Sequence, residues 1–190
     1  MSIKISHEHA LKLLFNQDYY KVIDAFLYLI KISKMKNINR EKKYIIQMTN
    51  DSETEYRLPY IILDNIPSIK TKATANSIID LLIKEDMIHF NDKLNSWEIP
   101  NMFNMLKDGS LEVKALFYTD DFYSLSYLEK KTLLYVVYIM STEEYKRTKV
   151  INLDVLSKDN LLINIYYNRD KNYINKQIQS VIEKYFIVIR

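Results

Sequence analysis

Residues 67–100 read PSIKTKATANSIIDLLIKEDMIHFNDKLNSWEIP, and their hydrophobic period changes near the middle. Over residues 71–86 apolar side chains recur every three or four positions, which is the period of an amphipathic helix. After residue 86 apolar and polar residues alternate, with a polar interruption at 91–95, as in two short strands joined by a turn. The stretch therefore predicts a turn, a helix and a two-stranded hairpin.

The predicted helix has two different faces. One face is apolar and should be buried, and it holds Ala75, Ile78, Ile79 and Leu82. The opposite face is small and polar, and it holds Lys72, Asn76, Asp80 and Lys84, with Ala73 and Ser77 beside them. Side chains of these sizes let a helix approach another molecule closely.

The sequence before this helix predicts further helices and one strand. Apolar spacing favours helix over residues 8–34, with an interruption at 16–18. Residues 37–43 form a polar break, and the apolar run at 44–48 is short enough to be a strand. Residues 58–66 predict a short helix, because Pro59 lies near the start and proline is tolerated in a first helical turn. Pro67 then marks the turn before the next helix.

This order of helix, turn, helix and two-stranded ribbon resembles a winged helix-turn-helix domain. The resemblance makes residues 58–66 the second helix, 71–86 the recognition helix and 87–99 the wing. It implies a DNA-binding function, although winged helices also serve as protein-binding modules.

The resemblance also suggests which side chains would touch DNA. Asn76 could form the paired hydrogen bonds to adenine that give specificity in the major groove. The cations and hydroxyls near the helix start could hold phosphate, helped by the positive end of the helix dipole. The negative charge of Asp80 would oppose contact with phosphate or a base unless this residue lies beyond the contact zone. The expected contacts in this region are Lys70, Thr71, Lys72, Thr74, Asn76, Ser77 and Lys93.

A second group of cations lies earlier in the chain. Residues 31–43 hold six basic side chains and one acid, Glu41, so they could form a footprint for phosphates. They could equally be a solvated helix end, because lysines are favoured near a helix carboxyl terminus. The cations of this group are Lys31, Lys34, Lys36, Arg40, Lys42 and Lys43, and all but Lys31 are added to the expected DNA contacts.

Several classes of chemistry are poorly supported. The chain has no cysteine, which excludes disulfides, thiolate zinc sites and a cysteine nucleophile. Its one glycine, Gly109, cannot build a glycine-rich phosphate loop. His7 and His9 are expected to be solvated near the chain start rather than to bind metal, and His89 should face solvent. We therefore expect no enzyme, cofactor or metal site, with an enzyme acting on nucleic acid as a remaining alternative.

Composition indicates a globular protein. Hydrophobic residues make up 48% of the chain and charged residues 27%, and the net charge is +3. No apolar run approaches the length of a membrane span, and the first residues lack the pattern of a signal peptide. We expect a cytoplasmic protein without a membrane partner.

The second half of the sequence repeats the order of the first. Ser126 and Glu129 have the spacing of a capping box, and a strongly apolar helix follows to residue 144. A short strand and short helix are expected between 146 and 160, then a striped helix after residue 168 and a strand at 186–189. The predicted fold is α+β and mostly helical: tandem winged-helix units at 1–105 and 106–190, the second with an incomplete wing.

The start of the second unit, ALFYTDDFYSLSYLEKKTLLYVVYIM, is similar to the start of winged-helix domains in plasmid and phage replication initiators of Gram-positive type. This resemblance covers about 26 residues and is mostly hydrophobic. It implies a role on duplex DNA in transcription, or in replication or segregation of a mobile element. The alternative is a protein-interaction scaffold, because tandem winged helices resemble accessory subunits of chromosome-organising complexes.

The predicted last strand suggests self-association. A strand at 186–189 without a neighbour would leave an open sheet edge, which favours pairing with another chain. We therefore expect a homodimer that reads a repeated half-site through its 58–99 regions.

Overall fold

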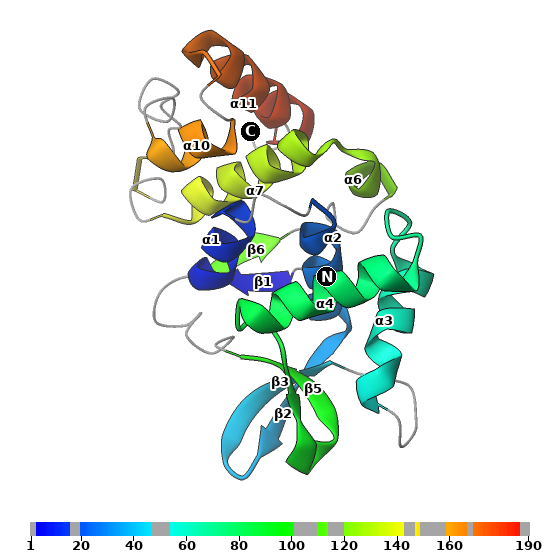
Figure 1. The fold of residues 1–190 in the computed structure, drawn as a ribbon. Helices are drawn as coiled ribbons and strands as arrows, with labels where there is room; N and C mark the ends of the chain where they lie inside the picture. Colours follow the sequence, from blue (N-terminus) through cyan, green and yellow to red (C-terminus); the bar gives the residue numbers. More distant parts are fainter. Residues whose placement is uncertain are drawn as a thin grey trace.

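The computed structural model describes residues 3–15, 20–46, 54–100, 110–113, 120–142, 147–148, 159–166 and 169–186. The fold is α+β and mostly helical, as the sequence predicts (Figure 1). In Figure 1 the helices α7, α10 and α11 form the upper part, and α3, α4 and a four-stranded sheet form the lower part. Helices α1 and α2 and a two-stranded sheet lie between them.

The elements of the first hundred residues are β1 (Ile3–Ser6), α1 (His7–Phe15), α2 (Tyr20–Ile32), β2 (Ser33–Ile38), β3 (Glu41–Ile46), α3 (Thr54–Asn65), α4 (Lys72–Lys84), β4 (His89–Asn91), the 3-10 turn η1 (Asp92–Leu94) and β5 (Ser96–Ile99). They are followed by β6 (Ser110–Val113), α6 (Asp120–Ser124), α7 (Tyr127–Ser141), α10 (Asn160–Ile165) and α11 (Lys171–Phe186). The predicted helical region at 8–34 is thus confirmed as two helices up to Ile32, whereas residues 33–34 belong to β2. The interruption at 16–18 lies outside the described residues.

The larger sheet is antiparallel, with the strand order β2-β3-β5-β4. Residues directly opposite each other in neighbouring strands share a face of the sheet. The inner face packs against the helical core and carries Tyr44, Ile46, Phe90, Trp97 and Ile99. The opposite face, called the outer sheet face below, carries Lys34, Lys36, Lys43, His89, Asn91 and Glu98.

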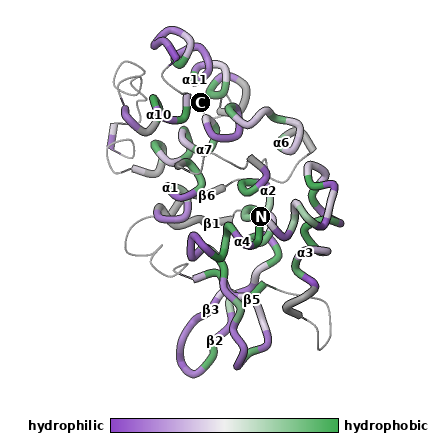
Figure 2. The backbone as a smooth tube through the Cα atoms, viewed as in Figure 1, coloured by the Kyte–Doolittle hydropathy of each residue, from purple (hydrophilic) through white to green (hydrophobic). Residues whose placement is uncertain are grey.

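Residues 33–46 form a β-hairpin, so the predicted polar break at 37–43 is wrong. Asn39 and Arg40 connect the two strands with positive φ angles of 52° and 68°, which is the conformation of a two-residue hairpin turn. The apolar end of β3 confirms the predicted strand at 44–46, whereas residues 47–48 lie outside the described part. The hairpin is largely hydrophilic (Figure 2), which fits the exposure of most of β2.

The two helices expected around Pro67 are present. Helix α3 begins four residues earlier than predicted, so Pro59 lies within the helix rather than in its first turn. Helix α4 begins after Thr71, whose side chain accepts a hydrogen bond from the Thr74 amide and caps the helix. The four apolar residues expected to face the core are all buried: Ala75, Ile78, Ile79 and Leu82.

The described residues share one hydrophobic core that spans both predicted units. Strand β1 pairs with β6, with Ile3 opposite Val113, so residues on either side of the expected boundary at 105 are joined in one small sheet. Helix α7 carries the predicted capping box between Ser126 and Glu129. Its middle is buried and packs against α11, α1 and α2.

The striped helix predicted after residue 168 is confirmed as α11, whereas other later predictions fall outside the described residues. A short strand and a short helix are expected at 146–160. Within this range the structure describes only residues 147–148, which are helical, and residues 159–160. Phe186, the first residue of the expected last strand, instead ends helix α11, and residues 187–190 are not described. The second predicted wing therefore remains a prediction.

His9 is buried, so its predicted solvation is wrong. It is 0% exposed and its ring packs edge-on against Phe26 at 5.1 Å. Burial lowers the pKa of His9 from 6.5 to about 4, because the charged imidazolium is disfavoured away from water. The prediction failed because α1 packs inside the fold instead of lying at a solvated chain start. The side chain of His7 is not described.

Candidate nucleic-acid interface

The exposed face of α4 is the centre of the expected site. Lys72, Asn76, Asp80 and Lys84 are all exposed, as their four-residue spacing predicts. Asn76 has no hydrogen-bond partner among the described residues, so its amide is available to a ligand. The face thus offers a cation, an amide, a carboxylate and a second cation along one helix.

The amino end of α4 places hydroxyl groups beside its first backbone amides. The Oγ1 atoms of Thr71 and Thr74 lie 2.9 Å apart and share a hydrogen bond. Thr71 Oγ1 also accepts a hydrogen bond from the Thr74 amide at 3.2 Å, and the Thr71 carbonyl accepts one from the Ala75 amide at 3.1 Å. The first amides of the helix have no carbonyl partner within the helix, so this end suits an anion.

Lys72 is held by a residue that sequence reasoning missed. Its Nζ atom donates to the Tyr60 hydroxyl at 2.7 Å and lies 4.4 Å from the centre of the Tyr60 ring. Tyr60 belongs to α3 and is itself 46% exposed. Because Tyr60 is neutral, this contact positions the ammonium group without cancelling its charge. No spacing within α4 could have indicated this partner, which comes from another helix.

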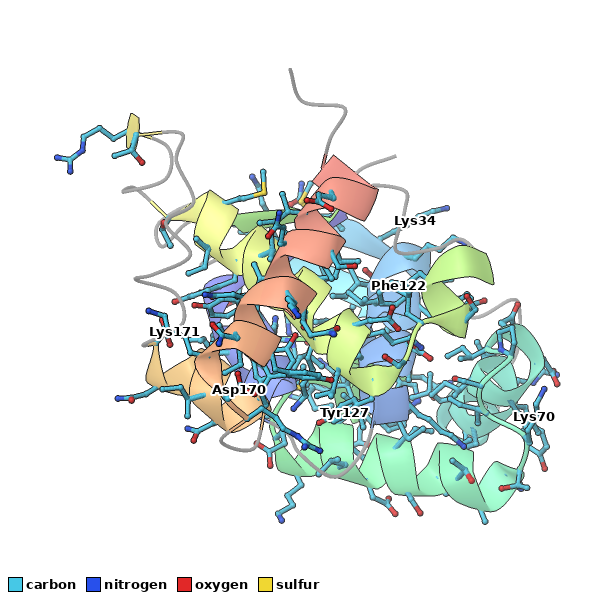
Figure 3. The ribbon with its side chains drawn as sticks, turned by 90° about the horizontal axis from the view of Figure 1, so that it is seen from above. Lys34, Lys70, Phe122, Tyr127, Asp170 and Lys171 are labelled. Atoms are coloured by element: carbon cyan, nitrogen blue, oxygen red, sulfur yellow. The ribbon has the colours of Figure 1, made fainter. Side chains whose placement is uncertain are left out.

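Ser77 is less free than expected. Its hydroxyl donates to the Ala73 carbonyl at 3.1 Å, so its hydrogen is already used within the helix. It retains lone pairs that can accept a hydrogen bond. Lys70, in contrast, is exposed in the turn before the helix. Figure 3 shows Lys70 beside the amino end of α4.

The hairpin predicted at 87–99 is confirmed as β4–η1–β5, and it is called the wing below after its expected role. The Asn91 side chain accepts the Leu94 amide at 3.2 Å, and Asn95 adopts a left-handed conformation with φ of 44°. The wing is joined to the core through Phe90 and Trp97, whose rings pack edge-on at 5.4 Å. Lys93 is exposed in the turn, as the resemblance implies.

The outer sheet face contains a carboxylate that sequence reasoning also missed. Glu98 is only 5% exposed, and both of its oxygens lie 3.3 Å from Lys43 Nζ. Glu98 further accepts from Asn91 Nδ2 at 2.6 Å and lies 3.1 Å from His89 Nε2. Lys43 is therefore neutralised, and His89, expected simply to face solvent, is half-buried and paired with Glu98.

A cavity of about 520 Å³ lies between the two hairpins. The β2–β3 hairpin contributes Asn39, Glu41 and Lys43, and the wing contributes residues 89–94. Its lining mixes cations with the carboxylates of Glu41 and Asp92, so it is not a simple anion site.

The cations of residues 31–43 do not lie on one common surface. Lys34 and Lys36 lie on the outer sheet face, Lys42 lies on the other face of the hairpin, and Arg40 lies in its turn. In Figure 3, seen from above, Lys34 lies on the opposite side of the molecule from α4. The structure thus brings together Lys70, Thr71, Lys72, Thr74, Asn76 and Ser77, and separates Lys34 and Lys36 from them.

Other types of site receive little support in the described residues. No group of three or more histidine, aspartate and glutamate side chains there could hold a metal ion. None of the helices in the described part is both long and apolar enough to cross a membrane.

Comparison of the chain with protein-family models, curated proteins and solved structures found no match.

Proposed function

We propose that this protein binds duplex DNA as a winged helix-turn-helix protein, with α4 as its recognition helix and β4–β5 as its wing. The observation that carries the proposal is the exposed face of α4, where Lys72 and Asn76 face solvent opposite a buried apolar stripe. The order α3, turn, α4 and two-stranded hairpin supports it.

The charges along α4 indicate which end would enter the DNA. Lys70, Lys72 and the positive end of the helix dipole make the amino end attractive to phosphate. Asn76 follows one turn later, where it can reach a base edge, because recognition helices contact bases through their amino-terminal residues. Asp80 comes a turn further, roughly 12 Å from Lys72 at a rise of 1.5 Å per residue. It would mark the end of the contact zone.

Tyr60 gives Lys72 a fixed direction in this arrangement. An ammonium group has three hydrogens, and the bond to the Tyr60 hydroxyl uses one of them. The other two remain for a phosphate oxygen. Holding the side chain in place before binding reduces the conformational entropy that binding would otherwise cost.

The two hairpins would supply contacts to the neighbouring backbone. Lys93 in the wing and Arg40 in the β2–β3 turn are exposed at the ends of their hairpins. With Lys70, Lys72 and Lys42, they would make about five phosphate contacts. The biological role that we propose is regulation of transcription, or of the replication or segregation of a mobile element. A homodimer would place two copies of α4 on a repeated site.

The test is selection of bound duplexes from a random pool, followed by a salt titration of the enriched sequence. We expect one sequence class to be enriched, and its affinity to fall with a log–log slope near −4 to −5, because about five phosphates are contacted. A pool that shows no enrichment and no binding at low salt would contradict the proposal. That result would favour a protein-interaction scaffold instead.

A further inference from the structure

Three distant segments of the chain meet at one buried ion pair. Lys130 of α7 donates from Nζ to both oxygens of Asp24 of α2, each at 2.8 Å. Ser68, in the turn between α3 and α4, donates its hydroxyl to Asp24 Oδ2 at 2.8 Å. The Asp24 carboxylate therefore links α7 to the turn that precedes α4.

The ion pair in this cluster is fully enclosed, and Ser68 is partly buried. Asp24 is 0% exposed and Lys130 is 1% exposed. Lys130 also donates to the Tyr123 carbonyl at 3.2 Å, and its ammonium lies 5.3 Å from the centre of the Phe122 ring. A buried ion pair is weak evidence for stability, because removing two charges from water offsets their attraction. Its directional bonds do, however, fix the positions of the elements they join.

Ser68 is well placed to set the position of α4. It lies between Ile66 and Ile69, which are both buried, and the Ile69 amide donates to the Ile66 carbonyl at 2.9 Å. Helix α4 begins only four residues later. At the other end, Lys12 of α1 donates to the Glu85 carbonyl at 2.8 Å. Both ends of α4 are thus held by elements outside the helix-turn-helix segment.

We infer that α7 positions the amino end of α4 through the Lys130–Asp24–Ser68 contacts, so the C-terminal helices take part in DNA recognition without touching DNA. The three residues are positioning residues. The DNA half of this inference rests on the proposed function, whereas the positioning half concerns the free protein alone.

The test replaces Ser68 by alanine, which removes one hydroxyl and leaves the ion pair in place. Amide hydrogen exchange would be followed at Thr74 and Ala75, whose amides donate to Thr71 in the first turn of α4. We expect exchange about tenfold faster, the size typical of one lost hydrogen bond to a charged group. Affinity for the selected duplex should fall by a similar factor, with a smaller loss on random duplex.

The matched control is Ser33→Ala. Ser33 also donates its hydroxyl at 2.8 Å, to the Ile30 carbonyl, but at the junction of α2 and β2. It should leave exchange at Thr74 and Ala75 unchanged. Ser68→Thr keeps the hydroxyl and should restore slow exchange, which guards against a general effect of changing this turn.

The outcomes separate the two halves of the inference. Unchanged exchange in Ser68→Ala, or equal acceleration in Ser33→Ala or Ser68→Thr, would overturn the positioning role. Faster exchange only in Ser68→Ala would support it. If exchange changes in this way but the wild-type protein binds no duplex, the positioning of α4 stands and the DNA-binding function is overturned.

Discussion

The exposed face of α4 and the outer sheet face both carry cations, but their partners differ. On α4, Lys72 contacts the neutral phenol of Tyr60 and keeps its charge available. On the sheet, Lys43 is bound to the nearly buried carboxylate of Glu98, which also holds His89. The two surfaces lie on different sides of the molecule, as Lys34 and Lys70 show in Figure 3.

This difference shows why counting charges in a window of sequence is a poor guide to a binding surface. Residues 31–43 are dense in cations, yet the hairpin distributes them over two faces, because successive side chains of a strand point in opposite directions. One of these cations is then neutralised by a residue from another strand. The sparser cations of α4 share one face and are not neutralised in this way.

Acid should destabilise the fold through His9, which is buried between α1 and Phe26 of α2. The pKa of His9 is lowered from 6.5 to about 4, so the unfolded chain takes up this proton first as pH falls. Stability is complete above pH 6.5 and is lost as pH falls toward 4, by up to about 3 kcal/mol. Denaturant unfolding at pH 7 and 4.5 would measure the loss.

The variant His9→Phe provides the comparison, because it removes the titrating group from α1 and keeps a ring against Phe26. Its stability should depend less on pH over this range than that of the wild type. Identical pH profiles for the two proteins would show that His9 does not cause the loss.

Replacing Glu98 by glutamine should leave Lys43 beside a neutral group, as Lys72 is beside Tyr60 on α4. The variant loses charge-assisted hydrogen bonds from Lys43 and His89, so we expect a loss of about 2 kcal/mol in unfolding free energy. The salt slope of DNA binding should stay nearly unchanged, because Lys43 lies on the outer sheet face with Lys36. Chemical denaturation tests the first effect, and unchanged stability would mean that these contacts are weak in solution.

Asn76→Ala tests whether the α4 face reads sequence. Removing an amide that pairs with adenine should weaken binding to the selected duplex by about 1–3 kcal/mol and leave random duplex nearly unaffected. Titrations against both duplexes measure the difference. An equal loss on the two would show that Asn76 is not a base reader.

The smallest effect is expected on the outer sheet face. Changing Lys34 and Lys36 together to alanine should alter the salt slope of DNA binding by less than one unit, because these residues lie away from α4. A slope that falls by about two units would place both lysines on phosphate and would mean that the two surfaces act together.

Features within one element could be predicted from the sequence. The buried stripe of α4, its start after Thr71 and the capping box of Ser126 and Glu129 each depend on residues a few positions apart. Helical geometry alone brings such residues together. The wing was also predictable, because its apolar residues alternate on a sheet with one buried face.

Features that depend on packing between elements could not be predicted. Strand β2 has exposed residues on both faces, so it lacks the apolar alternation that marks a strand. The partners Tyr60 and Glu98 come from other elements, and the pairing of Lys130 with Asp24 depends on how the two halves pack. The burial of His9 has the same origin.

The most direct test of the α4 interface is the salt dependence of DNA binding in Lys72→Ala. Lys176→Ala is the matched control, because Lys176 is also exposed on a helix but lies on α11, in the upper part of Figure 1. With α4 on the DNA, the log–log slope should become about one unit less steep in Lys72→Ala and remain unchanged in Lys176→Ala. Equal slopes for both variants and the wild type would contradict the assignment of α4 as the DNA-binding helix.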